Sequence, residues 1–353
     1  MSRTDIKVGV IGLGSISKFH IQGYVKAGAR IVHVSDINPR AAKEIIEKHH
    51  CRFSRDYREL LSNPEIEAIS VCTANTTHKK IVLETIDAGK HILCEKTLTA
   101  SREDSMEIVE KMRTVETIFQ IGYMKRFFPA FCKAKELISE IGEPFSAYLR
   151  SYQGGFLNRE ELDTLPEYMP GSENLSHIKR AVGGGMLNMG GSHLIDLVLW
   201  LVGKPEKVYA ANFTPPKYDA ELKSNLLLEL AGGGTVHVET VASPLTKIGY
   251  EGNGWDEKIE ITGCDGRMEI YSVLWNKPAG GTPLLRMYTE KDGCWREFDS
   301  RTANAFDEEI KYFLDCVESK VQGKPDVFDG YAVDNVLNAA YESVERGCPV
   351  DIG

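Results

Sequence analysis

The sequence predicts an α/β protein of two domains: an N-terminal doubly wound Rossmann domain with a parallel sheet, and a C-terminal α+β domain with an open, mostly antiparallel sheet. Short apolar runs alternate with helical periodicity up to residue 123, which is typical of βαβ units. From residue 124 onwards, runs with two-residue alternation follow one another between glycine-rich turns. A chain of 353 residues also exceeds what one hydrophobic core usually supports. We therefore place the boundary between domains 1–123 and 124–353.

The first domain is expected to alternate strands with helices. Its strands are almost continuously apolar, because helices cover both faces of a parallel sheet. The proline at position 39 suits the first turn of a helix. The expected strands are 6–11, 31–36, 68–73, 91–96 and 118–123, and the expected helices are 16–28, 39–49, 56–61, 76–88 and 102–114.

The second domain begins with a helix over 129–140. A glycine-rich helical stretch over 183–202 interrupts its strands, and helices over 304–319 and 329–346 follow them. The expected strands are 145–152, 207–214, 225–231, 234–242, 257–263 and 266–272.

Composition narrows the classes of partner and location. The net charge is −9 and lysine and arginine form no basic block, which excludes a protein built to neutralise nucleic-acid phosphates. No run approaches the roughly 20 apolar residues that span a membrane, and no signal-peptide pattern precedes the first strand. We expect a cytoplasmic protein with reduced thiols and no metal, because the eight cysteines form no C-x-x-C pair.

A phosphate-binding turn lies between the first strand and the first helix. Gly12 allows the tight turn, and Gly14 lets the backbone approach a pyrophosphate that rests on the helix N-terminus. Ser15 and Ile16 continue the loop, and Ser17 stands where the third small residue is usual. The glycines alone would also suit a purely structural turn, but a strand before and a helix after favour a dinucleotide site.

Asp36 ends the second strand and selects the cofactor. Its carboxylate is placed to accept hydrogen bonds from the adenosine ribose hydroxyls, and it would repel a 2′-phosphate. Arg40 lies one helical turn further on and would relieve part of that repulsion. NAD is therefore the expected cofactor, with NADP less favoured.

Two later strand ends carry polar groups, and ligands of open α/β sheets bind beyond the carboxyl ends of strands. The third strand runs into Thr73, Asn75 and His78, and the fourth into Glu95 and Lys96. On a surface, a Glu-Lys pair would be an ordinary solvated charge pair. Beside a dinucleotide, Lys96 can assist proton transfer at a substrate hydroxyl.

His193 opens an apolar helix after five glycines. This position suits a backbone close to a ligand and a side chain directed into a cleft. Asp196 lies three residues later on the same helix face and is a candidate to orient the imidazole. The alternative is simple helix capping, with Ser192 as N-cap and Asp196 favoured by the helix dipole.

Taken together, these residues resemble the Gfo/Idh/MocA family, the glucose-fructose oxidoreductase and inositol dehydrogenase group. The resemblance implies a Rossmann domain, an open-sheet domain that forms dimers or tetramers, and sugar, inositol or related polyol substrates. It places Lys96 and His193 at catalytic positions. The matching segments are VIGLGSISKFH, VCTANTTH, LCEKTL, IGYMKRF, GGGMLNMGGSHLIDLVLWLVG, FDEEIKYFLDCVESK and AAYESVERGCPV. The cofactor-side positions implied are Gly12, Gly14, Asp36, Thr73, Asn75, His78 and Glu95.

Two departures from the family pattern bear on the chemistry. The family's EKP motif reads Glu95-Lys96-Thr97 in this chain, so Thr97 replaces the proline and the lysine is retained. Met189 stands four residues before the histidine, where many dehydrogenases of the family carry Asp, and a methionine cannot accept a proton. His193 then acts alone, Tyr123 or Tyr152 substitutes, or the reaction differs from simple alcohol oxidation.

Substrate contacts are expected from Lys96, Tyr123, Arg126, Tyr152, Asn188 and His193, with Trp255 as a stacking surface. The long polar segment 152–180 is either a lid over the substrate or a disordered surface excursion. Its candidate contacts are Phe156, Arg159, Tyr168, His177, Lys179 and Arg180, whose charges leave an acidic sugar possible.

Three functions follow from this pattern. The leading one is an NAD-dependent dehydrogenase that moves hydride between nicotinamide and a hydroxyl carbon of a sugar, inositol or related polyol. The second retains NAD and uses transient oxidation to hydrolyse or eliminate glycosides. The third is a non-catalytic, dinucleotide-binding regulator, which Met189 favours.

Overall fold

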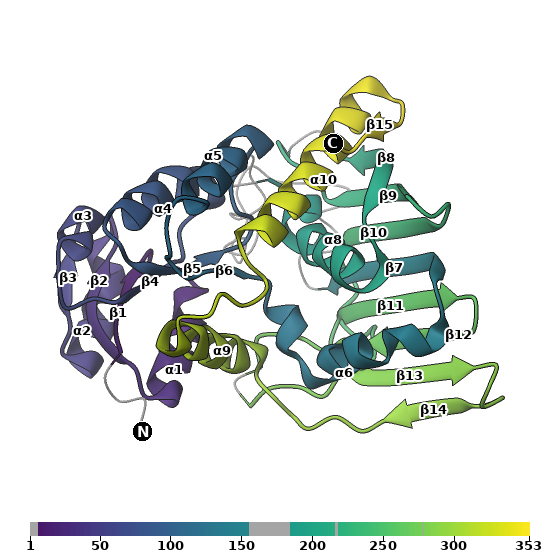
Figure 1. Cartoon of the computed structure of the whole chain (residues 1–353), viewed down its shortest axis with the longest axis horizontal. Coiled ribbons are helices and arrows are strands. Elements are labelled where there is room, and N and C mark those ends of the chain that lie inside the picture. Colours follow the sequence, from purple (N-terminus) through teal and green to yellow (C-terminus); the bar gives the residue numbers. More distant parts are fainter. Residues whose placement is uncertain (1–5, 155–183, 216–217, 278) are drawn as a thin grey trace. The chain divides into compact units, whose positions relative to one another are not determined.

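The computed structural model describes residues 6–154, 184–215, 218–277 and 279–353 of the chain (Figure 1). It divides into two compact units. The first contains Met1–Met124 and Ala305–Asp334, and the second contains Lys125–Asn304 and Asn335–Gly353. Residues 305–334 thus belong to the first unit, whereas the sequence placed them in the second domain. The boundary after residue 123 stays a prediction.

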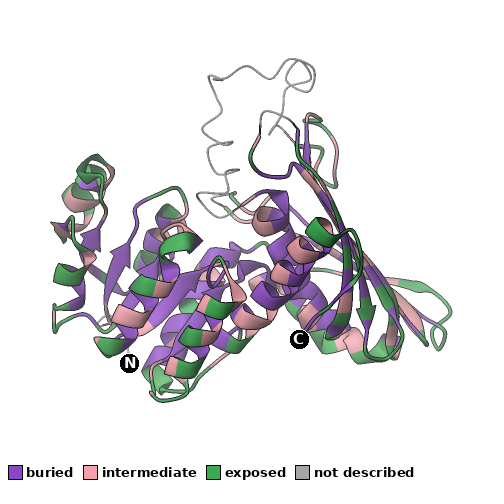
Figure 2. Ribbon diagram, turned by 90° about the horizontal axis from the view of Figure 1, so that it is seen from above, coloured by how far each residue is buried: buried purple, intermediate pink, exposed green. Residues whose placement is uncertain are grey.

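The first unit is built on a six-stranded sheet in the order β3-β2-β1-β4-β5-β6, with every pair parallel. All four residues of β4 are buried, as expected for a strand covered on both faces. Figure 2 shows strands coloured mostly as buried, with helices whose outer faces are coloured as exposed. The strands are β1 (Lys7–Ile11), β2 (Arg30–Ser35), β3 (Arg52–Ser54), β4 (Ala68–Val71), β5 (His91–Glu95) and β6 (Phe119–Gly122).

Helices follow most of these strands, which gives the βαβ order that the sequence predicts. The helices are α1 (Ser17–Ala27), η1 (Pro39–Ala42), α2 (Lys43–His49), α3 (Tyr57–Leu61), η2 (Asn75–Thr77), α4 (His78–Asp87) and α5 (Arg102–Met112), joined late in the chain by α9 (Ala305–Ser319) and the start of α10 (Val327–Arg346).

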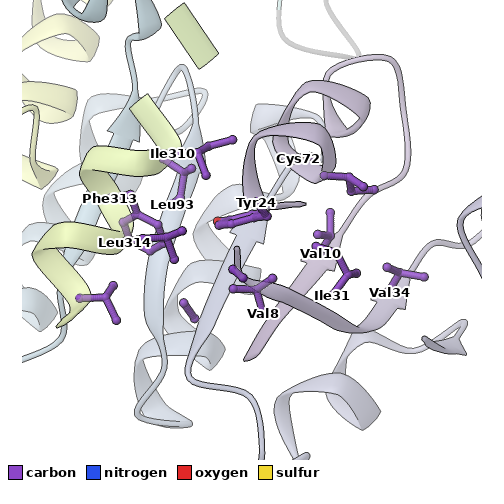
Figure 3. Packing of buried hydrophobic residues seen from close by; sticks show 14 of the residues in the cluster. Val8, Val10, Tyr24, Ile31, Val34, Cys72, Leu93, Ile310, Phe313 and Leu314 are labelled. Carbon is purple, nitrogen blue, oxygen red and sulfur yellow. The ribbon is translucent and has the colours of Figure 1, made fainter. Parts of the chain in front are cut away.

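Helix α9 completes the core of the first unit. Ile310, Phe313 and Leu314 are fully buried in the same apolar cluster as Tyr24 of α1 and Leu93 of β5 (Figure 3). At Gly23, an added Cβ would lie 2.5 Å from Cδ1 of Ile310. A glycine at this position lets α1 and α9 approach closely without displacing Ile310.

The second unit is built on a nine-stranded sheet in the order β14-β13-β12-β11-β7-β10-β9-β8-β15. The β7–β10 pair is parallel and the other pairs are antiparallel. The strands are β7 (Pro144–Gly154), β8 (Pro205–Phe213), β9 (Lys223–Leu230), β10 (Thr235–Ser243), β11 (Trp255–Gly263), β12 (Gly266–Tyr271), β13 (Leu284–Thr289), β14 (Trp295–Phe298) and β15 (Val350–Asp351).

Burial alternates along these strands. In β11, every second residue from Trp255 to Gly263 is buried and the residues between are half-buried, so one face is covered. The helices of this unit are η3 (Met124–Phe127, which begins on the last residue of the first unit), α6 (Pro129–Leu137), η4 (Ile138–Ile141), the π-helical turn η7 (Leu187–Gly191), α8 (Ser192–Leu197), the π-helical turn η8 (Val198–Val202) and the remainder of α10.

The predicted fold class is confirmed: a parallel Rossmann sheet followed by a mostly antiparallel sheet. Four strands were not predicted. β3 and β15 have three and two residues, too few for a periodic pattern, whereas β13 and β14 lie at one end of the sheet. The predicted helix 183–202 consists of α8 between two π-helical turns over its described residues.

Candidate active site

Gly12 follows β1 in a conformation that only glycine adopts readily. Its φ is +86°, and a Cβ there would lie 2.8 Å from the backbone C and O of Cys72. The Gly12 N–H donates to the Ser35 carbonyl at 2.8 Å. The turn is therefore packed against the ends of both neighbouring strands, as a tight phosphate-binding turn requires.

Gly14 presents the opposite situation. A Cβ there would meet no protein atom within 4 Å, so open space lies over its backbone. The hydroxyl of buried Ser17 donates to the Gly14 carbonyl at 2.7 Å, which explains how serine replaces the third small residue of the loop. Ser15 is exposed and Ile16 half-buried at the start of α1. This open cradle fits a dinucleotide pyrophosphate.

Asp36 lies directly after β2 and ties two loops together. Its Oδ2 accepts from the Leu13 N–H at 2.7 Å, and its Oδ1 accepts from the Asn38 N–H at 2.7 Å. The side chain is half-buried, and each carboxylate oxygen retains a further lone pair. Asp36 is thus held beside the phosphate loop as an acceptor, while Arg40 is exposed.

Asn75 and His78 lie between the ends of β4 and β5. Asn75 is buried; its Nδ2 donates to Thr97 Oγ1 at 2.7 Å, and its Oδ1 has no hydrogen-bond partner among the described residues. An unpaired buried carbonyl oxygen fits a donor on a bound dinucleotide. His78 Nδ1 lies 2.9 Å from the Thr97 carbonyl and Nε2 lies 3.0 Å from the Thr73 carbonyl.

His78 therefore acts on the loops rather than at an exposed surface. Its side chain is fully buried, and burial lowers its pKa, so the neutral ring donates to one of the two carbonyls. Thr73 is half-buried, and its Oγ1 accepts from Thr77 Oγ1 at 2.8 Å. Of the predicted cofactor-side residues, His78 contacts Thr73, and it links this loop to the Thr97 carbonyl.

Glu95 ends β5 and anchors a buried chain of hydrogen bonds. Its Oε1 lies 2.9 Å from His20 Nε2, and its Oε2 accepts from the Lys96 backbone N–H at 3.2 Å. The second His20 nitrogen lies 3.0 Å from Ser70 Oγ, which lies 2.7 Å from the Tyr24 hydroxyl. Burial raises the pKa of Tyr24 far above its usual range, so the phenol stays protonated.

Lys96 follows at the same edge of the sheet, and its side chain is half-buried. The Lys96–Thr97 peptide bond is cis. Tyr123 follows the neighbouring strand β6 and is fully buried. The first unit thus brings together the phosphate loop, Asp36, Asn75, Glu95 and Lys96 at the carboxyl ends of its parallel strands.

In the second unit, glycines set the helix that carries His193 close to the sheet. A Cβ on Gly190 would lie 2.5 Å from Gln153 Nε2 of β7, and one on Gly191 would lie 3.4 Å from Thr240 Cγ2 of β10. Glu221 Oε1 accepts from the Leu187 N–H at 2.9 Å at the start of this helical stretch. His193 is 9% exposed in the second residue of α8.

Asp196 pairs with Arg126. The Arg126 Nε lies 3.1 and 3.0 Å from the two carboxylate oxygens of Asp196, and both side chains are buried. The guanidinium carbon also lies 5.4 Å from the centre of the Trp200 ring. Arg126, predicted as a substrate contact, is thus held within the core of its own unit. Asp196, predicted to orient His193, is placed against Arg126.

Met189 lies among apolar side chains. It packs against a small cluster of Met186, Ala220, Leu222 and Ala242. The position where many relatives carry Asp therefore faces an apolar surface here. Asn188, the residue before it, is half-buried and lies close to Gly184, whose added Cβ would be 3.2 Å from Asn188 Cβ.

Tyr152 does not lie with His193. Side chains alternate between the faces of a strand, and Ser151 and Gln153 of β7 face Gly190 of the helical stretch. The Tyr152 hydroxyl instead donates to Glu239 at 2.8 Å on the other face of the sheet. The prediction that Tyr152 contacts substrate beside His193 is corrected on this ground.

One polar cluster was missed. Lys125 and Glu257 form a buried ion pair, with the Lys125 amine 5.5 Å from the centre of the Trp255 ring. Glu257 Oε1 and Trp255 Nε1 are buried without a hydrogen-bond partner among the described residues, on the strand face that also carries Gln153. The only sequence signal is glutamate on the covered side of an alternating strand, which composition alone suggests is exposed.

The segment 155–183, which includes the predicted lid contacts Phe156, Arg159, Tyr168, His177, Lys179 and Arg180, lies outside the described residues. Among the helices that the structure does describe, none is long and apolar enough to cross a membrane.

Comparison with known proteins defines the class and then the family. Residues 6–123 match the family model described as "Oxidoreductase family, NAD-binding Rossmann fold", which agrees with the cradle at Gly14. The class is therefore an NAD-binding oxidoreductase. Residues 131–269 match the GFO/IDH/MocA C-terminal domain. The chain belongs to the Gfo/Idh/MocA family, as its motifs predicted.

Individual relatives span nearly the whole chain. Inositol 2-dehydrogenase 2 of Saccharopolyspora erythraea is 28% identical, over 98% of this chain and 96% of the relative. The uncharacterized oxidoreductase YrbE of Bacillus subtilis is 26% identical, over 99% and 97%. A levoglucosan dehydrogenase in complex with NADH and L-sorbose superposes with a TM-score of 0.83 at 20% identity, over 99% of each chain, which shows a shared fold.

Proposed function

We propose that this protein is an NAD-dependent dehydrogenase that oxidises or forms a hydroxyl group on a sugar, an inositol or a related polyol. The observation that carries the proposal is the position of Lys96, which follows β5 at the same sheet edge as the Gly12–Gly14 cradle. Relatives named as inositol 2-dehydrogenase and levoglucosan dehydrogenase support the substrate class.

The cofactor contacts come from residues of the first unit. Gly12, Gly14, Ser15 and Ile16 would hold the pyrophosphate, and Asp36 the ribose hydroxyls. Thr73, Asn75, His78 and Glu95 would shape the nicotinamide end. When bound, NAD supplies the hydride acceptor.

Proton movement falls to the chain's own side chains. Lys96 would take the proton from the substrate hydroxyl oxygen through Nζ during oxidation, and return it during reduction. His193 would act on the same hydroxyl as a second donor or acceptor. The backbone N–H of Lys96 bonds to Glu95, so the network around Glu95 sets where the lysine chain begins.

Hydroxyl-rich substrates suit the polar groups of the second unit. We propose that Asn188, the Trp255 indole N–H and the Glu257 carboxylate oxygen bind substrate hydroxyls, because the last two are buried without partners among the described residues. Lys125 neutralises Glu257 and permits a charged group in that surface. Tyr123, which follows β6 in the first unit, stays a proposed substrate contact.

The test is a cofactor-reduction screen over sugars, inositols and amino sugars with NAD and NADP. Lys96→Ala should reduce turnover by about 10²–10⁴-fold while NAD still binds. Lys79→Ala is the matched control, since Lys79 pairs on the surface with Asp104 and Glu107. Unchanged turnover in Lys96→Ala would refute the assignment.

The same screen separates the other two functions. Product formation without net NADH would indicate an enzyme that retains its cofactor. Tight NAD binding with no hydride transfer across the panel would indicate a regulator.

We further propose a homodimer or homotetramer formed through the open face of the second unit's sheet. Tyr209, Leu227, His237 and Tyr148 lie in register across four adjacent strands on that face. Tyr209 and Leu227 are 44% and 46% exposed. A cytoplasmic location is proposed as well, because all eight cysteines are unpaired.

A further inference from the structure

Asp334 lies in the first half of α10, far in sequence from the lysine loop that it contacts. Its Oδ2 accepts from the Thr99 backbone N–H at 2.8 Å and from the Ser105 hydroxyl at 2.6 Å. The backbone N–H of Leu98 also bonds to the carboxylate. The side chain is buried, with 1% exposed. One carboxylate thus collects donors from the residues just after Lys96 and from α5.

The loop after Lys96 is fixed from its other side as well. Asn75 Nδ2 donates to Thr97 Oγ1 at 2.7 Å, and Thr97 Oγ1 donates to the Thr99 carbonyl at 3.0 Å. Asp334 binds the next backbone groups along the chain. Residues 97–99 are therefore clamped between η2 and α10, directly after the residue proposed to move the proton.

Securing a loop with a buried carboxylate has a high cost in free energy. Transfer of an ionised acid into the interior costs several kcal/mol unless hydrogen bonds compensate, and leucine would fill the same space next to Leu98 without that cost. An added Cβ on Gly330 would lie 3.2 Å from Leu98 Cβ, so α10 already packs closely there. Packing alone does not explain an acid at this position.

Burial also moves the titration of this acid close to neutral pH. It raises the pKa of Asp334 to about 7, against hydrogen bonds from Ser105, Thr99 and Leu98 that lower it. On β5, burial raises the pKa of the Cys94 thiol, and the carboxylates of Glu95 and Asp334 raise it further. Beyond it, Cys94 Sγ lies 3.5 Å from Nδ1 of His78 on α4, whose pKa burial lowers. The Cys94 thiol and the His78 ring are uncharged near neutral pH.

We infer that Asp334 is a positioning residue for the dehydrogenase reaction: its ionised carboxylate holds the Leu98 and Thr99 backbone so that Lys96 projects from a fixed base. This inference rests on the proposed role of Lys96. The ionised carboxylate accepts charge-assisted hydrogen bonds from these donors, and protonation removes the charge that strengthens them. Protonation loosens the loop, and turnover falls as the pH drops below neutrality.

The experiment compares the wild type with Asp334→Ala, Asp334→Asn and Phe313→Leu. Phe313 is a core residue of α9 and serves as a control for lost stability. Hydrogen exchange of the peptide covering residues 96–102 is measured by mass spectrometry, with kcat and NAD affinity on the substrate found by the screen. In Asp334→Ala, exchange of the Leu98 and Thr99 amides should rise. In that variant kcat should also fall about tenfold or more, with NAD affinity within twofold.

Asp334→Asn is neutral like the protonated acid, so its kcat should stay near the low value that the wild type reaches in acid, and the rise of kcat through about pH 7 disappears. Each of three results overturns the inference. The first is hydrogen exchange in Asp334→Ala at the wild-type rate, and the second is a kcat in that variant no lower than in a Phe313→Leu protein of equal thermal stability. The third is an unaltered pH profile of kcat in Asp334→Asn. If Asp334→Ala does not fold, the Asp334→Asn profile decides.

The two proposals fail separately. A wild type that oxidises nothing in the screen overturns the proposed function, but the exchange measurement still reports on the loop. In that case, the rate at which the Lys96 amine reacts with an acylating reagent replaces kcat. An equal rate in wild type and Asp334→Ala then overturns the positioning role.

Discussion

Gly14→Ala separates cofactor binding from folding. An added methyl group at Gly14 would meet no protein atom within 4 Å, and Gly14 is not among the residues with positive φ. The substitution should therefore leave stability unchanged or raise it by about 0.4–1 kcal/mol, because alanine restricts the unfolded chain. The same methyl group would fill the space proposed for the pyrophosphate. We expect the Kd for NAD to rise at least tenfold, or about 1.4 kcal/mol.

The matched variant is Gly12→Ala. The left-handed conformation alone costs about 1–2 kcal/mol for an alanine, and its Cβ would lie 2.8 Å from the Cys72 backbone. Here the apo protein itself should lose thermal stability. Thermal unfolding with and without NAD, together with calorimetric titration, distinguishes the two effects. A Gly14→Ala protein that binds NAD within twofold of the wild type would show that the reasoning about the cradle is wrong.

Other changes test single parts of the structure. Asp36→Asn should narrow the preference for NAD over NADP by about tenfold, measured as the two dissociation constants, because the charge that repels a 2′-phosphate is gone. Arg126→Met leaves Asp196 buried without its partner and should cost roughly 3–5 kcal/mol in urea unfolding; a loss confined to KM would contradict this role. Because burial raises the pKa of Asp334 to about 7, the folded state keeps this proton longer than the unfolded state does. Protonation of Asp334 therefore stabilises the folded state. This contribution is present in acid and is lost as the pH rises through about 7, so Asp334→Asn should flatten the pH dependence of the free energy of unfolding. Leu227→Asp on the open sheet face should lower the mass measured by light scattering towards that of the monomer. An unchanged mass would exclude this face as the oligomer interface.

The sequence predicted most of the architecture because its signals are local. The apolar runs of the parallel sheet, the glycine turn at Gly12 and the alternating strands each depend on residues close in the chain. The parallel pairing of β7 with β10 was not foreseen, since it joins residues about 90 positions apart with no local mark. α9 was assigned to the wrong unit for the same reason.

The site residues also divide into those with a local sequence signal and those without one. Gly12, Gly14, Asp36 and Lys96 were found because each follows a strand at a characteristic position. The partners of Arg126 and Tyr152 were not, because Asp196 and Glu239 reach them through tertiary packing. Polar residues near a predicted site suggested ligand contacts, and the structure assigns these two to internal pairs.

The contribution of α9 to the first unit decides how the chain can be cut. Stopping a fragment at residue 124 would strip Ile310 and Phe313 from Tyr24 and Leu93 and leave bare apolar surface in water. A cofactor-binding module that folds alone must instead retain residues 305–334, joined by a linker in place of 125–304. Recombination with other members of the family therefore needs three crossover points, after residues 124, 304 and 334, and a chimera made with a single junction would inherit a mismatched core.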